Sequence, residues 1–143
     1  MAKAVVLLVD DEQEFREVLS RRMEIWGFKV DTAPGGKEAL KKVAGKTYDA
    51  VILDLAMPEM GGIETLKRML EIRPELQIIV LTGHATVQDG VEAMKLGAVD
   101  FIEKPAEKEK LVAKIEQARD RRQELFENQL DEKISDIMKK KGW

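Results

Sequence analysis

The sequence predicts an α/β protein, a doubly wound parallel sheet with helices on both faces. Short apolar runs alternate five times with amphipathic segments, and glycine or proline separates many of them. Strands that alternate with helices form parallel sheets, because each right-handed crossover brings the chain back in the same direction. With 143 residues, 44% of them hydrophobic, the chain is long enough for one domain with a substantial core.

The predicted strands are short apolar segments that end at polar residues or at turns. Residues 4–9 form a continuous apolar run before Asp10, as expected of a strand that is buried on both faces. Residues 28–33 alternate between apolar and polar side chains, which also favours a strand. The other three strands are expected at residues 49–54, 76–82 and 98–103.

The predicted helices carry apolar residues at steps of three and four. Residues 12–26 form one such stripe, which Gly27 ends. Residues 62–72 stop before Pro74, because the residue before a proline avoids the helical conformation. Further helices are expected at residues 34–45, at residues 86–96 and after Pro105. Gly90 lowers the stability of its helix by about 1 kcal/mol relative to alanine, so we expect this helix to be unusually mobile.

Residues 107–143 predict a long helical region, because they contain no proline and no glycine before Gly142. One apolar stripe points toward the sheet and consists of Leu111, Ile115 and Ala118. A second stripe, slightly out of phase, consists of Phe126, Leu130, Ile134 and Ile137. This second stripe fits a linker, a dimerisation helix, a helix folded back on the domain or a solvated terminal helix. We expect a second short helix after a break near Asn128, packed on the domain or on a partner.

We therefore expect a domain at residues 1–122 and a C-terminal helical extension at residues 123–143, with no effector domain. The sequence has no GxxxxGK[ST] phosphate loop, and residues after 120 leave no room for a helix-turn-helix.

Composition excludes several classes of protein and site. The 27 acidic and 24 basic residues give a net charge of −3, which predicts no direct binding to nucleic acid and no attraction to anionic membranes. With no cysteine and a single histidine, disulfides, thiolate chemistry and a histidine-rich zinc site are excluded. No apolar stretch has the length of a membrane span or a signal-peptide core, so we expect a soluble, cytoplasmic protein.

Five polar side chains stand where the predicted strands end: Asp10, Asp11, Asp54, Thr82 and Lys104. Parallel strands bring these ends to one edge of the sheet, where such sheets bind ligands. Three carboxylates in one cleft repel each other unless a cation lies between them, and a set of oxygen ligands favours Mg²⁺. A lysine balances charge, a threonine hydroxyl donates to a phosphoryl oxygen, and an aspartate can accept a phosphoryl group. This makes Asp54 a candidate nucleophile, exposed at the end of a rigid strand.

Each of these residues also has a simpler explanation on its own. Asp10 and Asp11 could cap the next helix, and Asp54 could start a turn. Thr82 is an ordinary residue for a strand end, and Lys104 an ordinary surface charge. Only their common position at one sheet edge is specific.

Four segments resemble the receiver domain of two-component response regulators: VDDE (9–12), VILDLAMPEMGGIE (51–64), IIVLTGH (78–84) and GAVDFIEKP (97–105). The resemblance covers about residues 4–120, and residues 91–105 are most similar to receivers of the nitrogen-regulator type. It implies a flavodoxin-like (βα)5 sandwich with five parallel strands in the order 2-1-3-4-5. The chain departs from the family pattern at Gly61, where an aspartate is common before Gly62.

The resemblance also implies a role for each site residue. Asp54 would be the phosphoacceptor, and a sensor histidine kinase would be the donor. Asp11, Asp54 and the backbone carbonyl of Ala56 would hold Mg²⁺, with Asp10 acting through water. Lys104 would contact the phosphoryl group.

Three further implications concern the switch. Thr82 would move toward the phosphoryl group, and Phe101 would follow as the switch aromatic, although plain core packing is an alternative for Phe101. The bond between Lys104 and Pro105 would be cis. The fourth helix, fifth strand and fifth helix would then bind a downstream protein or a second copy of the chain.

Two other functions remain open at this point. One is a protein-binding module that works without phosphorylation. The other is a phosphatase of the haloacid-dehalogenase type, which needs an acid two residues after the nucleophile, where this chain has Ala56. On the favoured interpretation the protein is not an enzyme, except that it catalyses its own phosphorylation and dephosphorylation.

Overall fold

The computed structural model describes residues 3–57, 60–83 and 87–142. Its strands are β1 (Val5–Val9), β2 (Lys29–Ala33), β3 (Ala50–Asp54), β4 (Ile78–Thr82) and β5 (Asp100–Glu103). Its helices are α1 (Gln13–Ile25), α2 (Gly36–Gly45), α3 (Gly62–Ile72), α4 (Val87–Leu96) and α5 (Lys108–Lys140). The strands are all parallel and follow the order β2-β1-β3-β4-β5, which confirms the predicted fold class and strand order.

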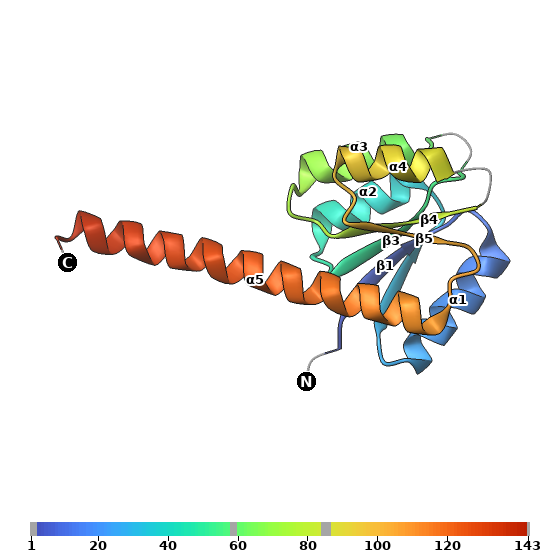
Figure 1. Cartoon of the computed structure of the whole chain (residues 1–143), viewed down its shortest axis with the longest axis horizontal. Helices are drawn as coiled ribbons and strands as arrows, with labels where there is room; N and C mark the ends of the chain where they lie inside the picture. Colours follow the sequence, from blue (N-terminus) through green and yellow to red (C-terminus); the bar gives the residue numbers. More distant parts are fainter. Residues whose placement is uncertain (1–2, 58–59, 84–86, 143) are drawn as a thin grey trace.

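The sheet is buried on both faces, which explains why its central strands are continuous apolar runs. On one face, β1, β3 and β4 pack against α2, α3 and α4, where Leu66 and Met69 are fully buried. On the other face they pack against α1 and α5, where Met23 and Ile115 are fully buried. Figure 1 shows this three-layer arrangement, with α2, α3 and α4 above the sheet and α1 and α5 below it.

Several elements are shorter than the sequence predicted, because their end residues close turns. Ala98 was expected in a strand, but its N–H donates to the carbonyl of Ala93 and ends α4. Gly97 makes this return possible with a φ of 121°, a conformation that favours glycine. Leu76 was also expected in a strand, but its N–H donates to the carbonyl of Arg73 in the turn before β4.

Helix α5 differs most from the sequence prediction. It runs without interruption through Asn128 to Lys140, so the expected break is wrong. Leu111, Ile115 and Ala118 are buried against the sheet as predicted, whereas beyond half-buried Leu125 every described residue is exposed. Figure 1 shows the second half of the helix extending away from the sheet, so the expected packing of this segment on the domain is also wrong.

The physical reason is that nothing in residues 119–140 breaks a helix, since this segment lacks proline and glycine. The predicted domain boundary at residue 122 falls inside this continuous helix and stays a prediction. Within the described part of the chain, no helix combines the length and the apolar character that a membrane span requires.

Candidate functional site

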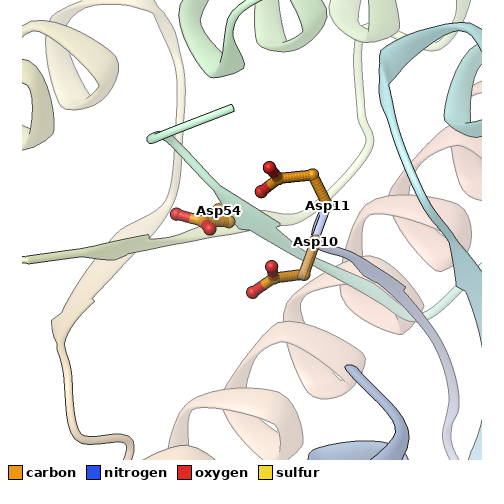
Figure 2. A group of neighbouring side chains, drawn as sticks. All are labelled: Asp10, Asp11 and Asp54. Carbon is orange, nitrogen blue, oxygen red and sulfur yellow. The ribbon is translucent and has the colours of Figure 1, made fainter. Parts of the chain in front are cut away.

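Three aspartates meet at the edge of the sheet where the parallel strands end. Asp10 and Asp11 follow β1, and Asp54 is the last residue of β3. One carboxylate oxygen from each lies within 4.8 Å of the other two. Figure 2 shows the three side chains grouped at this edge. Asp10 and Asp54 are 0% and 2% exposed, whereas Asp11 is open to solvent. The predicted cluster therefore forms, but the expectation of an exposed Asp54 is wrong, because the Ala56 turn and the Lys104 side chain lie against its carboxylate.

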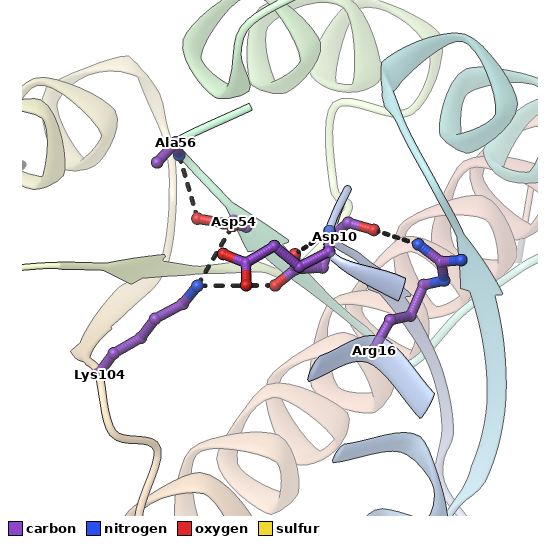
Figure 3. Close-up of polar contacts among 6 residues, drawn as sticks. Asp10, Arg16, Asp54, Ala56 and Lys104 are labelled. Carbon is purple, nitrogen blue, oxygen red and sulfur yellow. Dashed lines mark hydrogen bonds and ion pairs between the residues drawn. The ribbon is translucent and has the colours of Figure 1, made fainter. Parts of the chain in front are cut away.

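Asp10 takes part in several hydrogen bonds, but one of its carboxylate oxygens accepts none from the described residues. Its Oδ1 accepts the N–H of Glu12 at 2.9 Å, and its backbone carbonyl accepts from Arg16 Nη1 at 2.7 Å (Figure 3). Its Oδ2 has no hydrogen-bond partner in the described part of the chain. Burial, aided by the negative charge of Asp54, raises the pKa of Asp10 to about 6.

The capping explanation for Asp10 and Asp11 does not hold. Glu12 occupies the cap position of α1, and no side chain caps that end of the helix. Instead, the Asp10 carboxylate accepts the N–H of Glu12, two residues later, and this hydrogen bond forms a turn just before the helix begins.

Asp54 does form a turn, and this role coexists with its place in the cluster. Its Oδ1 accepts the N–H of Ala56 at 3.0 Å, while Oδ2 accepts from Lys104 Nζ at 3.3 Å. Gly62 allows α3 to begin directly beside this strand end, because a Cβ there would lie 2.4 Å from Leu55 Cα and 2.9 Å from the carbonyl oxygen of Asp54. Sequence reasoning treated Gly62 only as part of a motif. A Cβ at Gly61 would meet open space, so the departure from the family pattern costs no packing.

Lys104 reaches the carboxylates from the loop after β5. Its Nζ also lies 3.6 Å from Asp10 Oδ2, and its peptide bond to Pro105 is cis. Burial alone would lower the pKa of Lys104, but the carboxylates of Asp54 and Asp10 outweigh it and raise this pKa, so the ammonium stays charged. The ammonium also lies 4.5 Å from the centre of the Phe15 ring. Phe15 was read only as part of a helical stripe, and no spacing signal marked this contact.

Thr82 and Phe101 come from neighbouring strands. Thr82 ends β4 with a fully buried side chain, and its Oγ1 has no hydrogen-bond partner among the described residues. Phe101 lies in β5 and is 39% exposed, which does not fit the core-packing alternative. His84, which the sequence places two residues after Thr82, lies outside the described residues.

The donor set fits a hard divalent cation. All three side chains offer carboxylate oxygen, the ligand type that Mg²⁺ prefers. Two of the carboxylates are buried, and one of their oxygens, Asp10 Oδ2, accepts no hydrogen bond within the described residues, an arrangement that costs free energy until a cation or water satisfies it.

Comparisons with known proteins agree with this geometry. The family model for the response regulator receiver domain matches residues 6–116. The chain is 37% identical over 113 residues to the transcriptional regulatory protein ZraR of Klebsiella oxytoca, covering 79% of this chain and 26% of that protein. It is 40% identical over 116 residues to the transcriptional regulatory protein FixJ of Bradyrhizobium diazoefficiens, covering 81% of this chain and 57% of that protein.

A solved structure gives the same result. The response regulator receiver domain protein from Clostridium thermocellum superimposes with a TM-score of 0.82 at 32% identity, covering 85% of this chain and 98% of that one. The chain thus spans about a quarter of ZraR but nearly all of an isolated receiver. Because the family model matches well over half of the chain, this protein belongs to the response regulator receiver family, the phosphoryl-accepting signalling modules of two-component systems.

Proposed function

We propose that Asp54 is the phosphoacceptor of this module and that a sensor histidine kinase is its donor. The observation that carries this proposal is the position of the Asp54 carboxylate, which lies at a fixed strand end between a charged lysine and two further carboxylates. An Asp54 oxygen would attack phosphorus as the bond from phosphorus to the kinase histidine nitrogen breaks, and that nitrogen would take the electron pair. Attack by water later releases phosphate, so the chain's own catalysis is limited to gaining and losing this group.

The proposed Mg²⁺ ligands are the carboxylates of Asp11 and Asp54 and the backbone carbonyl of Ala56, with Asp10 acting through water. Oδ2 of Asp10 supports this assignment, because it is a buried acceptor close to the other two carboxylates and accepts no hydrogen bond from any described residue. When bound, the ion supplies positive charge that offsets the repulsion between the carboxylates and the phosphoryl oxygens.

Lys104, Thr82 and Phe101 complete the proposed switch. The Lys104 ammonium orients the phosphoryl group and balances its charge. The Thr82 hydroxyl, which has no hydrogen-bond partner among the described residues, turns to donate to that group. Phe101 then moves into the space that Thr82 leaves. The proposed docking face for a downstream protein is formed by α4, β5 and α5, where Val91, Met94 and Phe101 are exposed apolar side chains.

Intact mass spectrometry after incubation with acetyl phosphate and Mg²⁺ tests the acceptor. The unmodified chain is expected to gain one phosphoryl group, and Asp54→Asn none. Asp89→Asn, which changes an exposed carboxylate on α4, serves as the matched control and should label like the parent. Equal labelling of Asp54→Asn would move the acceptor elsewhere, and no labelling of the parent would favour a binding module that works without phosphorylation.

A second observation favours a homodimer. The protruding half of α5 exposes one row of large apolar side chains, here called the extension stripe: Phe126, Leu130, Ile134, Ile137 and Met138. A helix that packs against nothing is only marginally stable in water, and exposed apolar rows of this kind mark interaction surfaces. We infer that the extension stripe of a second copy covers this row.

Charges beside the extension stripe favour a parallel pair. Glu127 and Asp131 each follow a stripe residue by one position, so they lie on one flank at 100° per residue, whereas Lys133 precedes Ile134 and lies on the other. Lys140 shares the basic flank, and Asp136 is the exception to it. In a parallel pair the acidic flank of one helix faces the basic flank of the other, whereas in an antiparallel pair like flanks meet.

Cysteine crosslinking decides the orientation, because the chain contains no cysteine. Gln123→Cys and Lys141→Cys lie near opposite ends of the extension stripe. In a parallel dimer each variant forms a disulfide with itself, whereas in an antiparallel dimer crosslinks form only between the two variants. Ser135→Cys on the opposite helix face is the control and should remain unlinked. Crosslinks only in the mixture would overturn the parallel arrangement, and none at all would overturn the dimer.

A further inference from the structure

Gly90 lies at the point where α4 meets both proposed switch residues. It is buried in the middle of α4. A Cβ built there would lie 3.1 Å from Cγ2 of Thr82 and 3.8 Å from Cδ2 of Phe101. Carbon atoms pack best about 3.5–4.0 Å apart, so the first distance is too short and the second is an ordinary contact. The methyl group of Thr82 therefore occupies space that a side chain at residue 90 would need.

The backbone of Thr82 cannot retreat to make more room. Its carbonyl accepts the N–H of Lys104 at 2.7 Å, and the carbonyl of the preceding residue, Leu81, accepts the N–H of Leu55 at 3.2 Å. Thr82 is thus fixed between β3 and β5. Threonine is also branched at Cβ, so the methyl and the hydroxyl move together about one stiff torsion angle. A change in the methyl position therefore changes where the hydroxyl points.

We propose that Gly90 is a positioning residue for the switch. It leaves room for the methyl of Thr82 in the resting, unphosphorylated arrangement and so holds the Thr82 hydroxyl away from Asp54. This inference rests on the proposed role of Thr82 as a hydroxyl donor to the phosphoryl group. An added methyl at residue 90 crowds the resting position only. Relief comes when Thr82 moves toward Asp54, so Gly90→Ala shifts the balance toward the phosphoryl-binding arrangement.

A double-mutant cycle with Thr82→Ser directly tests the contact between residue 90 and the methyl group of Thr82. Serine keeps the hydroxyl and lacks Cγ2, so it removes the crowded atom. Affinity for beryllofluoride, an inorganic mimic of the aspartyl-phosphate group, is measured with Mg²⁺ by titration calorimetry. Gly90→Ala is expected to raise this affinity severalfold in the parent and to leave it unchanged in the Thr82→Ser background. Gly45→Ala, at a helical glycine with open space around it, is the matched control and should change nothing.

Urea unfolding without Mg²⁺ gives a second, independent measurement. Alanine ordinarily stabilises a helix relative to glycine. Here that gain is expected only in the Thr82→Ser background, because in the parent the crowding cancels it. An equal effect of Gly90→Ala in both backgrounds would show that it acts through helix propensity, and a loss of beryllofluoride affinity would contradict the direction. Both outcomes overturn the inference.

The two proposals fail in different ways. If the parent and Asp54→Asn give the same heat with beryllofluoride, the acceptor assignment fails, and the unfolding cycle still decides whether Gly90 seats Thr82.

Discussion

The ammonium of Lys104 lies 3.3 Å from Oδ2 of Asp54, although fifty residues separate them in the chain. The same ammonium lies 3.6 Å from Oδ2 of Asp10. Both carboxylates are almost fully buried, so this lysine partly neutralises two charges that water does not reach. The stability of the metal-free protein and its proposed chemistry therefore both involve this one lysine side chain.

Lys104→Met is expected to destabilise the metal-free protein by about 2 kcal/mol, because it leaves two buried carboxylates without their cation. The effect is smaller than for a fully buried pair, because the lysine side chain is 24% exposed. Urea unfolding in EDTA measures it. Lys104→Arg keeps the positive charge and should recover part of the loss. Identical midpoints for Lys104→Met and the parent would show that the ion pair contributes nothing.

Asp10→Asn is expected to stabilise the metal-free protein by about 1–2 kcal/mol at pH 8. The folded-state pKa of Asp10 is raised to about 6, so its ionisation costs stability as the pH rises through that value. The same substitution weakens the proposed magnesium site, in which Asp10 acts through water, so Mg²⁺ should raise the thermal midpoint of the parent more than that of the variant. Unfolding with and without Mg²⁺ measures both effects. A variant less stable than the parent in EDTA would contradict this account.

Arg122→Gln is expected to loosen the point where α5 leaves the domain. Arg122 Nη1 lies 2.9 Å from Oδ1 of Asp49, whose Oδ2 accepts the N–H of Val5 at 2.8 Å. Loss of this partly exposed ion pair should cost about 0.5–1 kcal/mol and speed amide exchange beyond Ala118. Arg119→Gln is the matched control, because Arg119 forms its ion pair with its neighbour Asp120 in the same helix. Unchanged exchange in Arg122→Gln would mean that apolar packing alone fixes the helix.

Tyr48→Phe is expected to lower the free energy of unfolding by about 1–2 kcal/mol at pH 7, because the Tyr48 hydroxyl donates to Oδ2 of Asp31 at 2.8 Å. Hydrogen bonds from Lys46 and Tyr48 lower the pKa of Asp31, so its contribution is complete above the ordinary value of 3.8 and is lost as the pH falls through the folded value. The difference between parent and variant should therefore shrink in acid. Urea unfolding from pH 7 to pH 2 checks this.

Absorbance gives a direct check, because Tyr48 is the only tyrosine. Burial and the Asp31 carboxylate raise its pKa, so phenolate absorbance should appear above pH 10 in the native protein. Titration at the ordinary value would show that the hydrogen bond does not persist in solution.

The sequence by itself determined the order of elements, the fold class and the residues that gather at the sheet edge. These features follow from local periodicity and from topology: apolar runs specify strands, and parallel strands place Asp10, Asp54 and Thr82 at one edge wherever the intervening helices pack. The apolar stripe of α5 toward the sheet was predictable for the same reason.

Only the tertiary structure decided the burial of Asp54, the contact of Lys104 with Phe15, the close approach of Gly90 to the methyl group of Thr82, and the uninterrupted course of α5 past Asn128. Each depends on distances between segments far apart in the chain or, for α5, on whether any surface is available to bend it back. A residue's type fixes its chemistry and its local conformational preference. Its burial and its neighbours are fixed by packing between distant segments, which local sequence patterns do not reveal.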